Sequence, residues 1–267
     1  MATLEEIKAR QPAIWASGDY SKVAWVTVPL ADTLVEAVEL RPGSKVLDVA
    51  TGTGHVALAA ARRFCVVVGV DFVPALLDVA RRRAAAEGLE VTFIEGDAEN
   101  LPCSDGEFDY ELSAIGAMFA PNQEKTASEL LRVTRSGGTI GMINWTPTGF
   151  VGEVFKTVAK YVPPPPDLKP ATLWGTEERV RELLGSGVSH LVFKRDRLRQ
   201  RFLSPEHYAD FFLTWYGPIL KASESMEPST REAFRADLIA VASRFNSATD
   251  GSAAIDSDYM IVIATKN

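Results

Sequence analysis

The chain has 267 residues, of which 46% are hydrophobic and 24% are charged, and it carries a formal net charge of −7. This composition is that of an ordinary globular protein, and the length suits one large α/β domain or a domain with a cap. The acidic balance argues against a nucleic-acid-binding surface and against a polybasic membrane anchor, because both need clustered basic residues.

The start of the sequence and its cysteines carry few further signals. No signal-peptide core begins the sequence and no apolar run is long enough to span a membrane, so we expect a cytoplasmic protein. Cys65 and Cys103 are expected to be reduced thiols, and no Cys/His cluster has the spacing of a metal site. We therefore predict no metal, no nucleic-acid partner and no membrane span, while a homo-oligomer is compatible with the sequence.

Residues 1–44 precede the first predicted strand. Leu4 to Trp15 and Pro29 to Leu40 have the apolar spacing of helices, whereas Tyr20 to Val28 is ambiguous. A nucleotide-binding fold does not need so long an N-terminal segment. The segment is either a lid, with Gly18 as its hinge, or a packing appendage.

The stretch from Lys45 to Arg63 has the pattern of a buried strand, a glycine-rich turn and a helix. Such a unit places a ligand on free backbone N–H groups at a helix N-terminus. Gly52 and Gly54, with Ala57 three residues further on, fit the dinucleotide-binding pattern. Asp48 opposes that reading, because a carboxylate beside the loop repels a pyrophosphate and favours an ammonium group.

Strands and helices continue to alternate as far as Trp145. The predicted strands are 46–50, 66–71, 91–97, 108–116 and 139–145, and the predicted helices are 56–63, 74–87 and 122–134. A turn is predicted at 136–138, just before the fifth strand. Short strands that alternate with helices imply right-handed crossovers and a parallel sheet.

Four segments of this region are informative because of the order in which they follow one another. They are Asp48 to Gly54, Val66 to Asp71, Val91 to Ala98 and Phe108 to Gly116. In that order they resemble motif I and the second, third and fourth strands of class I methyltransferases that depend on S-adenosylmethionine (SAM). The similarity covers roughly residues 45–145 and is greatest to the subgroup of quinone-biosynthesis and small-molecule methyltransferases.

The resemblance implies a Rossmann-like α/β fold. We expect a seven-stranded, mostly parallel sheet with an antiparallel C-terminal strand, helices on both faces, an N-terminal lid and a helical cap. Residues 45–145 would form the SAM-binding core, after the lid of residues 1–44. In this family, material after the fifth strand often builds a substrate cap, which we place at 146–188.

Residues 189–267 are expected to complete the sheet and to add cap helices. Strands are predicted at 190–202 and 259–265, and helices at 205–221 and 230–246. Arginines at positions 195, 197, 199 and 201 share one face of the first strand. This pattern favours an edge strand that avoids aggregation, with an anion-binding surface as the alternative.

The resemblance also implies which residues bind SAM. Asp71 would hold the ribose hydroxyls, and Asp97 would accept from the adenine amino group. Phe72 would flank the adenine and Ala98 would offer its backbone N–H. The predicted cofactor-binding set is Tyr20, Asp48, Ala50, Thr51, Gly52, Gly54, Asp71, Phe72, Gly96, Asp97, Ala98 and Ser113.

Aromatic and apolar residues near strand ends or in cap segments predict an apolar acceptor site, although many such residues simply form core. The predicted substrate-binding set is Trp15, Met118, Phe119, Trp145, Trp174, Phe211, Trp215 and Tyr216. No general base is evident. Tyr20 and His207 are the candidate catalytic residues, each with packing as the alternative.

We therefore predict SAM-dependent methyl transfer to an oxygen or carbon of a hydrophobic small molecule, such as a natural product, quinone or lipid-like metabolite, with S-adenosylhomocysteine as the product. The alternatives are a SAM-binding protein without methyl transfer, such as a scaffold or cyclisation catalyst, and an NAD(P)-dependent oxidoreductase, which Asp48 and the Gly96-Asp97 element oppose. Many small-molecule methyltransferases rely on proximity alone, so the lack of an evident base does not decide between them.

Overall fold

A computed structural model of the protein describes residues 3–267, so the first two residues of the predicted N-terminal lid lie outside it. Within this range seven strands form one sheet in the order β3-β2-β1-β4-β5-β7-β6. The first five strands pair in parallel, and β7 runs antiparallel to β5 and to β6. The predicted Rossmann-like fold with an antiparallel C-terminal strand is confirmed.

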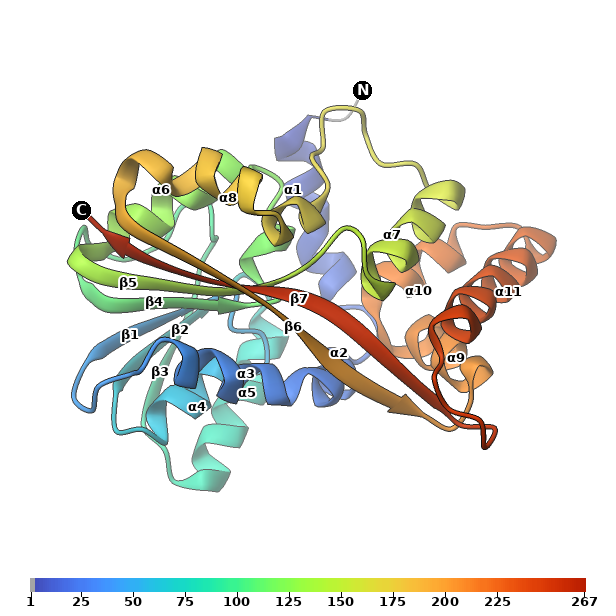
Figure 1. Ribbon diagram of the computed structural model, residues 1–267, viewed down its shortest axis with the longest axis horizontal. Coiled ribbons are helices and arrows are strands. Elements are labelled where there is room, and N and C mark those ends of the chain that lie inside the picture. Colours follow the sequence, from blue (N-terminus) through green and yellow to red (C-terminus); the bar gives the residue numbers. More distant parts are fainter. Residues whose placement is uncertain (1–2) are drawn as a thin grey trace.

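The central strands are short and apolar because helices cover both faces of the sheet. The parallel strands are β1 (Lys45–Val49), β2 (Val66–Asp71), β3 (Val91–Glu95), β4 (Phe108–Ala114) and β5 (Thr134–Trp145). Helices α3 (Val28–Ala37), α4 (His55–Ala61) and α5 (Pro74–Glu87) lie on one face, and α6 (Gln123–Val133) and α8 (Glu177–Leu184) lie on the other (Figure 1). The main hydrophobic core fills the space between these layers.

A long antiparallel pair of strands extends the sheet beyond its parallel strands. Its strands are β6 (Val188–Phe202) and β7 (Ala253–Lys266), which run on toward a group of helices at one end of the molecule (Figure 1). That group consists of α7 (Phe150–Tyr161), α9 (Pro205–Trp215), α10 (Gly217–Glu224) and α11 (Pro228–Phe245). These helices enclose a second hydrophobic cluster, which we call the cap cluster.

The N-terminal segment folds as expected and settles the ambiguous stretch. Helix α1 (Leu4–Trp15) begins at a capping box between Thr3 and Glu6. Tyr20 to Thr27 forms α2 (Tyr20–Ala24) and a short 3₁₀ turn, η1 (Trp25–Thr27). Among residues 3–267 no helix is both long enough and apolar enough to cross a membrane.

Two local expectations were wrong. Strand β5 includes residues 136–138, which were predicted as a turn; they lie in an irregularity of the strand, between Thr134, which pairs with Phe108, and Thr139, which pairs with Tyr110. The predicted helix 205–221 is two helices, since Tyr216 leaves helical geometry before the Gly217-Pro218 pair. The segment 146–188, for which a substrate cap was predicted, packs in two places: α7 joins the cap cluster, whereas η3 (Ala171–Gly175) and α8 pack against β5 and α6.

Strand β6 lies at the sheet edge, as its arginines predicted, and their side chains are exposed. Arg199 forms two hydrogen bonds with Asp256 of β7 at 2.7 Å each. Cys65 and Cys103 are free thiols.

Candidate active site

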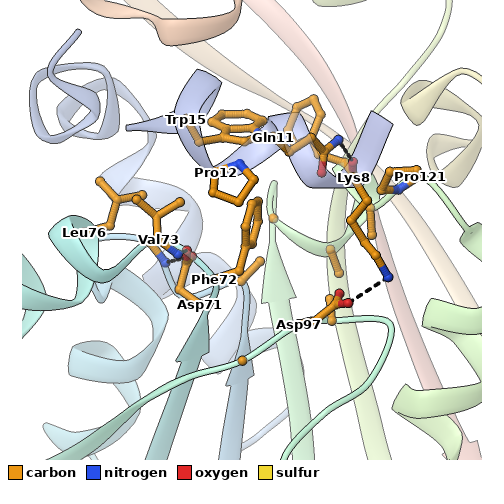
Figure 2. A pocket seen from close by; sticks show the side chains of 18 of the residues that line it. Lys8, Gln11, Pro12, Trp15, Asp71, Phe72, Val73, Leu76, Asp97 and Pro121 are labelled. Atoms are coloured by element: carbon orange, nitrogen blue, oxygen red, sulfur yellow. Dashed lines mark hydrogen bonds and ion pairs between the residues drawn. The ribbon is translucent and has the colours of Figure 1, made fainter. Parts of the chain in front are cut away.

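A cavity of about 710 Å³ opens at the carboxyl ends of the parallel strands and is covered by α1. The loops that follow β1, β2, β3 and β4 supply its floor, through residues such as Gly52, Asp71, Asp97 and Gly116. Lys8, Gln11, Pro12 and Trp15 of α1 face this floor (Figure 2). The carboxyl edge of a parallel sheet is where α/β folds bind ligands, so this is the candidate active site.

The glycine-rich loop after β1 is braced from behind by Asp48. Its carboxylate accepts hydrogen bonds from the Thr51 hydroxyl at 2.5 Å and from the Ala57 N–H at 2.9 Å. Burial raises the pKa of Asp48 to about 7, and the two hydrogen bonds oppose that shift. Gly52 and Gly54 have φ values of +55° and +83°, in the left-handed region that favours glycine.

Asp71 ends β2 and its carboxylate reaches the same loop. It accepts from the Gly52 N–H at 2.8 Å and from the Val73 N–H at 2.9 Å. Burial raises the pKa of Asp71 to about 6 against the effect of these hydrogen bonds. The carboxylate therefore fixes the glycine loop relative to the start of α5 while also lining the cavity.

An ion-pair cluster ties α1 to the opposite side of the cavity. Lys8 Nζ lies 2.8 Å from Asp97 Oδ2 and 2.8 Å from Glu99 Oε2. Glu99 is only 2% exposed, and its other oxygen accepts from the Asn122 N–H at 2.7 Å. Gln11 donates to the Phe119 carbonyl at 3.0 Å. We call the Lys8, Asp97 and Glu99 group the clasp; Figure 2 shows its Lys8–Asp97 pair.

The charge of the cavity favours a cationic ligand. Four carboxylates line it, from Glu5, Asp71, Glu95 and Asp97, against the single cation of Lys8. A pyrophosphate would meet repulsion here, whereas an ammonium and a sulfonium group would be attracted. The residues present therefore fit SAM better than a dinucleotide.

Two smaller cavities adjoin the main one. The first, which we call the apolar chamber, has about 60 Å³ of free volume and lies between the sheet and the cap cluster, with Trp145, Phe150 and Tyr216 among its walls. The second, of about 40 Å³, lies behind the glycine loop beside Asp48 and His55.

Tyr20 and Ile115 line all three cavities. Ile115 follows β4 with φ at +52°, an uncommon conformation for a β-branched residue that is held by its N–H bond to the Ile143 carbonyl at 2.9 Å. Backbone strain of this kind is typical of functional sites. Burial, and then the charge of Asp71, raise the pKa of Tyr20 to about 12, so its hydroxyl keeps its proton at neutral pH.

Comparison with known proteins agrees with this geometry. A family model described as a methyltransferase domain matches residues 46–138. The uncharacterized protein Rv1405c of Mycobacterium tuberculosis is 43% identical over 221 residues, which cover 82% of this chain and 81% of that protein. The demethylmenaquinone methyltransferase of Thermus thermophilus is 42% identical over 132 residues, which cover 48% of this chain and 60% of that protein.

Residues 46–138 are a methyltransferase domain, which confirms the predicted class I SAM-dependent family. The YcgJ protein of Bacillus subtilis shares the fold with a TM-score of 0.60 at 19% identity, over 89% of this chain and 97% of that one. SAM is the cofactor of this family member, and a small-molecule methyl acceptor is implied.

The predicted cofactor residues of this class I methyltransferase divide by location. Those that line the main cavity are Tyr20, Ala50, Gly52, Asp71, Phe72, Gly96, Asp97 and Ala98. Asp48, Thr51, Gly54 and Ser113 lie behind this surface. The Ser113 hydroxyl donates to the Val49 carbonyl at 2.8 Å and accepts from the Ala117 N–H at 2.9 Å, so it braces the loop after β4. Direct contact with SAM stays a prediction for all twelve residues.

The predicted acceptor residues are more scattered. Phe119 lines both the main cavity and the apolar chamber, Trp15 lines the former, and Trp145 and Tyr216 line the latter. The others line none of the three cavities: Met118 and Trp174 are buried in the main core, and Phe211 and Trp215 lie on α9.

His207 does not line any of these cavities either. Its Nδ1 accepts from the Leu203 N–H at 3.3 Å, and its ring lies beside Phe202 and Phe211. This placement offers no geometric support for a catalytic role. Among residues 3–267 no group of three or more His, Cys, Asp or Glu side chains is arranged to hold a metal ion.

Several site residues escaped the sequence analysis. Lys8 and Gln11 share a helical face with Trp15, a spacing that could have drawn attention to them. Gln200 lies between Arg199 and Arg201 in the sequence but on the opposite, inward face of β6. Ile115 carried no signal, because its strained backbone depends on the tertiary structure.

Proposed function

We propose that the protein transfers a methyl group from SAM to an oxygen or carbon of a hydrophobic small molecule of quinone-like or lipid-like character. One observation carries the proposal: the cofactor cavity and the apolar chamber meet at Tyr20 and Ile115. A methyl group presented at this junction would face a chamber that suits an apolar acceptor. The similarity to a demethylmenaquinone methyltransferase supports the same class of acceptor.

The chemistry is an in-line displacement. When bound, SAM would supply an electrophilic methyl group: a bond forms between the acceptor atom and the methyl carbon, the sulfur–carbon bond breaks with its electron pair kept by sulfur, and the acceptor's proton passes to bulk water. The protein's contribution is to align the acceptor and to exclude water. Tyr20 keeps its proton at neutral pH, so in this proposal it donates a hydrogen bond and does not act as the base.

The cofactor-binding roles follow from the cavity lining. Asp71 would accept from the ribose hydroxyls while holding the glycine loop, and Asp97 would accept from the adenine amino group beside Lys8. Phe72, next to Asp71, would flank the adenine. The small cavity beside Asp48 and His55 would receive the methionine end.

Within the predicted lid of residues 1–44, helix α1 would be the part that covers the cavity. None of its residues is buried, and Pro12 interrupts its backbone hydrogen bonding, so it depends on its contacts across the cavity. Gly18 anchors the C-terminal end of this helix: a Cβ at this position would lie 2.5 Å from the Trp215 carbonyl oxygen. A lid fixed near Gly18 would open at its N-terminal end, where the clasp is.

Methyl-labelled SAM provides the test. The protein is incubated with labelled SAM and with apolar or polar fractions of a bacterial metabolite extract, and label is followed into products while S-adenosylhomocysteine is quantified. We expect label to enter apolar products, in step with S-adenosylhomocysteine. Binding of S-adenosylhomocysteine with no transfer to any fraction would favour a SAM-binding protein without methyl transfer. Transfer confined to polar fractions would refute the proposed acceptor class.

A further inference from the structure

One polar side chain in the apolar chamber has an unpaired oxygen. Gln200 of β6 is 5% exposed and lines the chamber, and its Oε1 has no hydrogen-bond partner within residues 3–267. A buried carbonyl oxygen without a donor costs free energy that an apolar side chain would not. A ligand that donates to this oxygen would remove the cost.

The neighbours of Gln200 show that packing alone does not call for an amide. Leu198 and Phe202 are buried on the same face of β6, whereas Arg199 and Arg201 point outward and are exposed. The buried part of this row is otherwise apolar, since Leu198 belongs to the main core and Phe202 to the cap cluster. An apolar residue at position 200 would complete this row without leaving a polar atom unpaired.

Tyrosine hydroxyls supply hydrogen-bond donors in the same chamber. Tyr20, Tyr208 and Tyr216 all line it. Burial raises the pKa of Tyr216 well above its usual value, and the proximity of Tyr20 and Tyr208 adds to that shift. Burial likewise raises the pKa of Tyr208, so these hydroxyls stay protonated at neutral pH. The chamber therefore combines an unpaired acceptor oxygen with O–H groups.

We propose that Gln200 is the polar anchor of the methyl acceptor, and that the acceptor is an apolar molecule with a neutral phenolic, enolic or alcoholic hydroxyl group. Such a hydroxyl donates to Gln200 Oε1 and can accept from a tyrosine hydroxyl, whereas an ether or ketone only accepts and leaves Gln200 unpaired. A carboxylate does not donate, and burial penalises its charge. The inference rests on the proposed function, because it takes the apolar chamber as the acceptor site.

An acceptor of aromatic size needs the chamber to widen beyond its present volume of about 60 Å³. The walls belong to separate elements, because Phe150 and Phe155 come from α7, Tyr208 from α9 and Ile219 from α10. Helices α9 and α10 are themselves separate, because helical geometry is broken at Tyr216. Gln200, on a strand paired along its whole length with β7, stays fixed while the helices shift.

The test compares 1-naphthol with 1-methoxynaphthalene, which retains an acceptor oxygen but has no O–H donor. Affinities for the full chain are measured by calorimetry, with and without S-adenosylhomocysteine. We expect the wild-type protein to prefer 1-naphthol by about tenfold or more, as for loss of a buried hydrogen bond. Gln200→Met should bring the two affinities to within about threefold, because it removes the amide and keeps the side-chain length.

Leu198→Met is the matched control, since Leu198 is an inward neighbour on the same strand that does not line the chamber; it should keep the wild-type preference. Equal wild-type affinities, no binding of 1-naphthol up to millimolar concentration, or an unchanged preference in Gln200→Met would each overturn the anchor. The comparison of the two ligands in the wild-type protein tests the anchor even if the variant does not fold. Failure of methyl transfer would refute the proposed function and still leave the hydroxyl preference measurable without cofactor.

Discussion

Replacement of Lys8 by methionine should release the lid. Lys8 Nζ is 2.8 Å from both Asp97 and Glu99, and its side chain is 22% exposed. The hydrogen bonds to the two carboxylates raise the pKa of Lys8 although burial, the largest single effect, lowers it, so the ammonium stays charged in the clasp. Methionine keeps the length of the side chain and removes the charge.

The free energy that the closed lid loses on this replacement depends mainly on Glu99. Its side chain is 3% exposed, so without Lys8 a buried carboxylate would keep only its hydrogen bond from Asn122. Breaking a fully buried pair costs about 3–5 kcal/mol. Asp97 is 35% exposed and water screens that half of the clasp. We therefore expect the closed lid to lose about 1–3 kcal/mol, or roughly 5- to 150-fold in its population relative to the open lid.

Limited proteolysis near residues 10–25 reports on the lid. In the wild-type protein, S-adenosylhomocysteine should slow cleavage, and Lys8→Met should be cleaved faster both with and without it. Arg10→Met is the control, because it removes a positive charge from an exposed position of the same helix. Equal cleavage rates in the two variants, each folded by circular dichroism, would refute the role of the clasp.

Four further outcomes are expected. Asp71→Ala should weaken S-adenosylhomocysteine binding by about 1–3 kcal/mol in calorimetry, through loss of charge-assisted hydrogen bonds; unchanged affinity would contradict the ribose assignment. Tyr20→Phe should slow methyl transfer from labelled SAM, and wild-type turnover would remove its hydroxyl from the mechanism. Trp145→Ala should alter acceptor turnover while SAM affinity stays within a few-fold, whereas parallel loss of both in a folded protein would contradict a separate acceptor wall. Glu111→Gln should stabilise the protein at pH 8 and not at pH 4. Burial, and then the charge of Asp48, raise the pKa of Glu111 in the folded protein. The stability of the wild-type protein therefore falls as the pH rises from the unfolded pKa of about 4.3 toward the higher folded pKa. Thermal unfolding of the two proteins at both pH values checks this, and an equal pH dependence would argue against the burial of a protonated Glu111.

Much of the fold could be predicted because its strong signals are local. The helix Leu4 to Trp15 and the strand Val66 to Asp71 match their predicted bounds, since each apolar period is closed by a charged or glycine residue. The errors arise where contacts with other parts of the chain determine the bounds of an element. Residues 136–138 were predicted as a turn, yet they lie within β5, as an irregularity between Thr134 and Thr139, which pair with β4. The break at Tyr216 has a local signal in Gly217-Pro218 that the helical spacing of the flanking residues hid.

The cofactor side of the site was more predictable than the acceptor side. Gly52, Asp71 and Asp97 stand at fixed distances from strand ends, and the strand order brings those ends together. The acceptor wall is built by elements far apart in the sequence, so the sequence does not show that Trp145 faces the chamber while Trp174 lies in the main core. No single-residue property separates these two tryptophans.

Helix α1 contacts both halves of the site, the cofactor cavity and the wall of the apolar chamber. Lys8 reaches Asp97 at the predicted adenine end. Seven residues further on, about 10 Å along the helix, Trp15 packs edge-on against Tyr20, Phe119 and Tyr216, with ring centroids 5.8, 5.0 and 5.7 Å away. Because those three side chains also wall the apolar chamber, a displacement of α1 disturbs the acceptor wall as well as the cofactor cover. The Lys8→Met variant should therefore weaken acceptor binding although Lys8 lies outside the chamber, whereas Trp145→Ala should change the acceptor side alone.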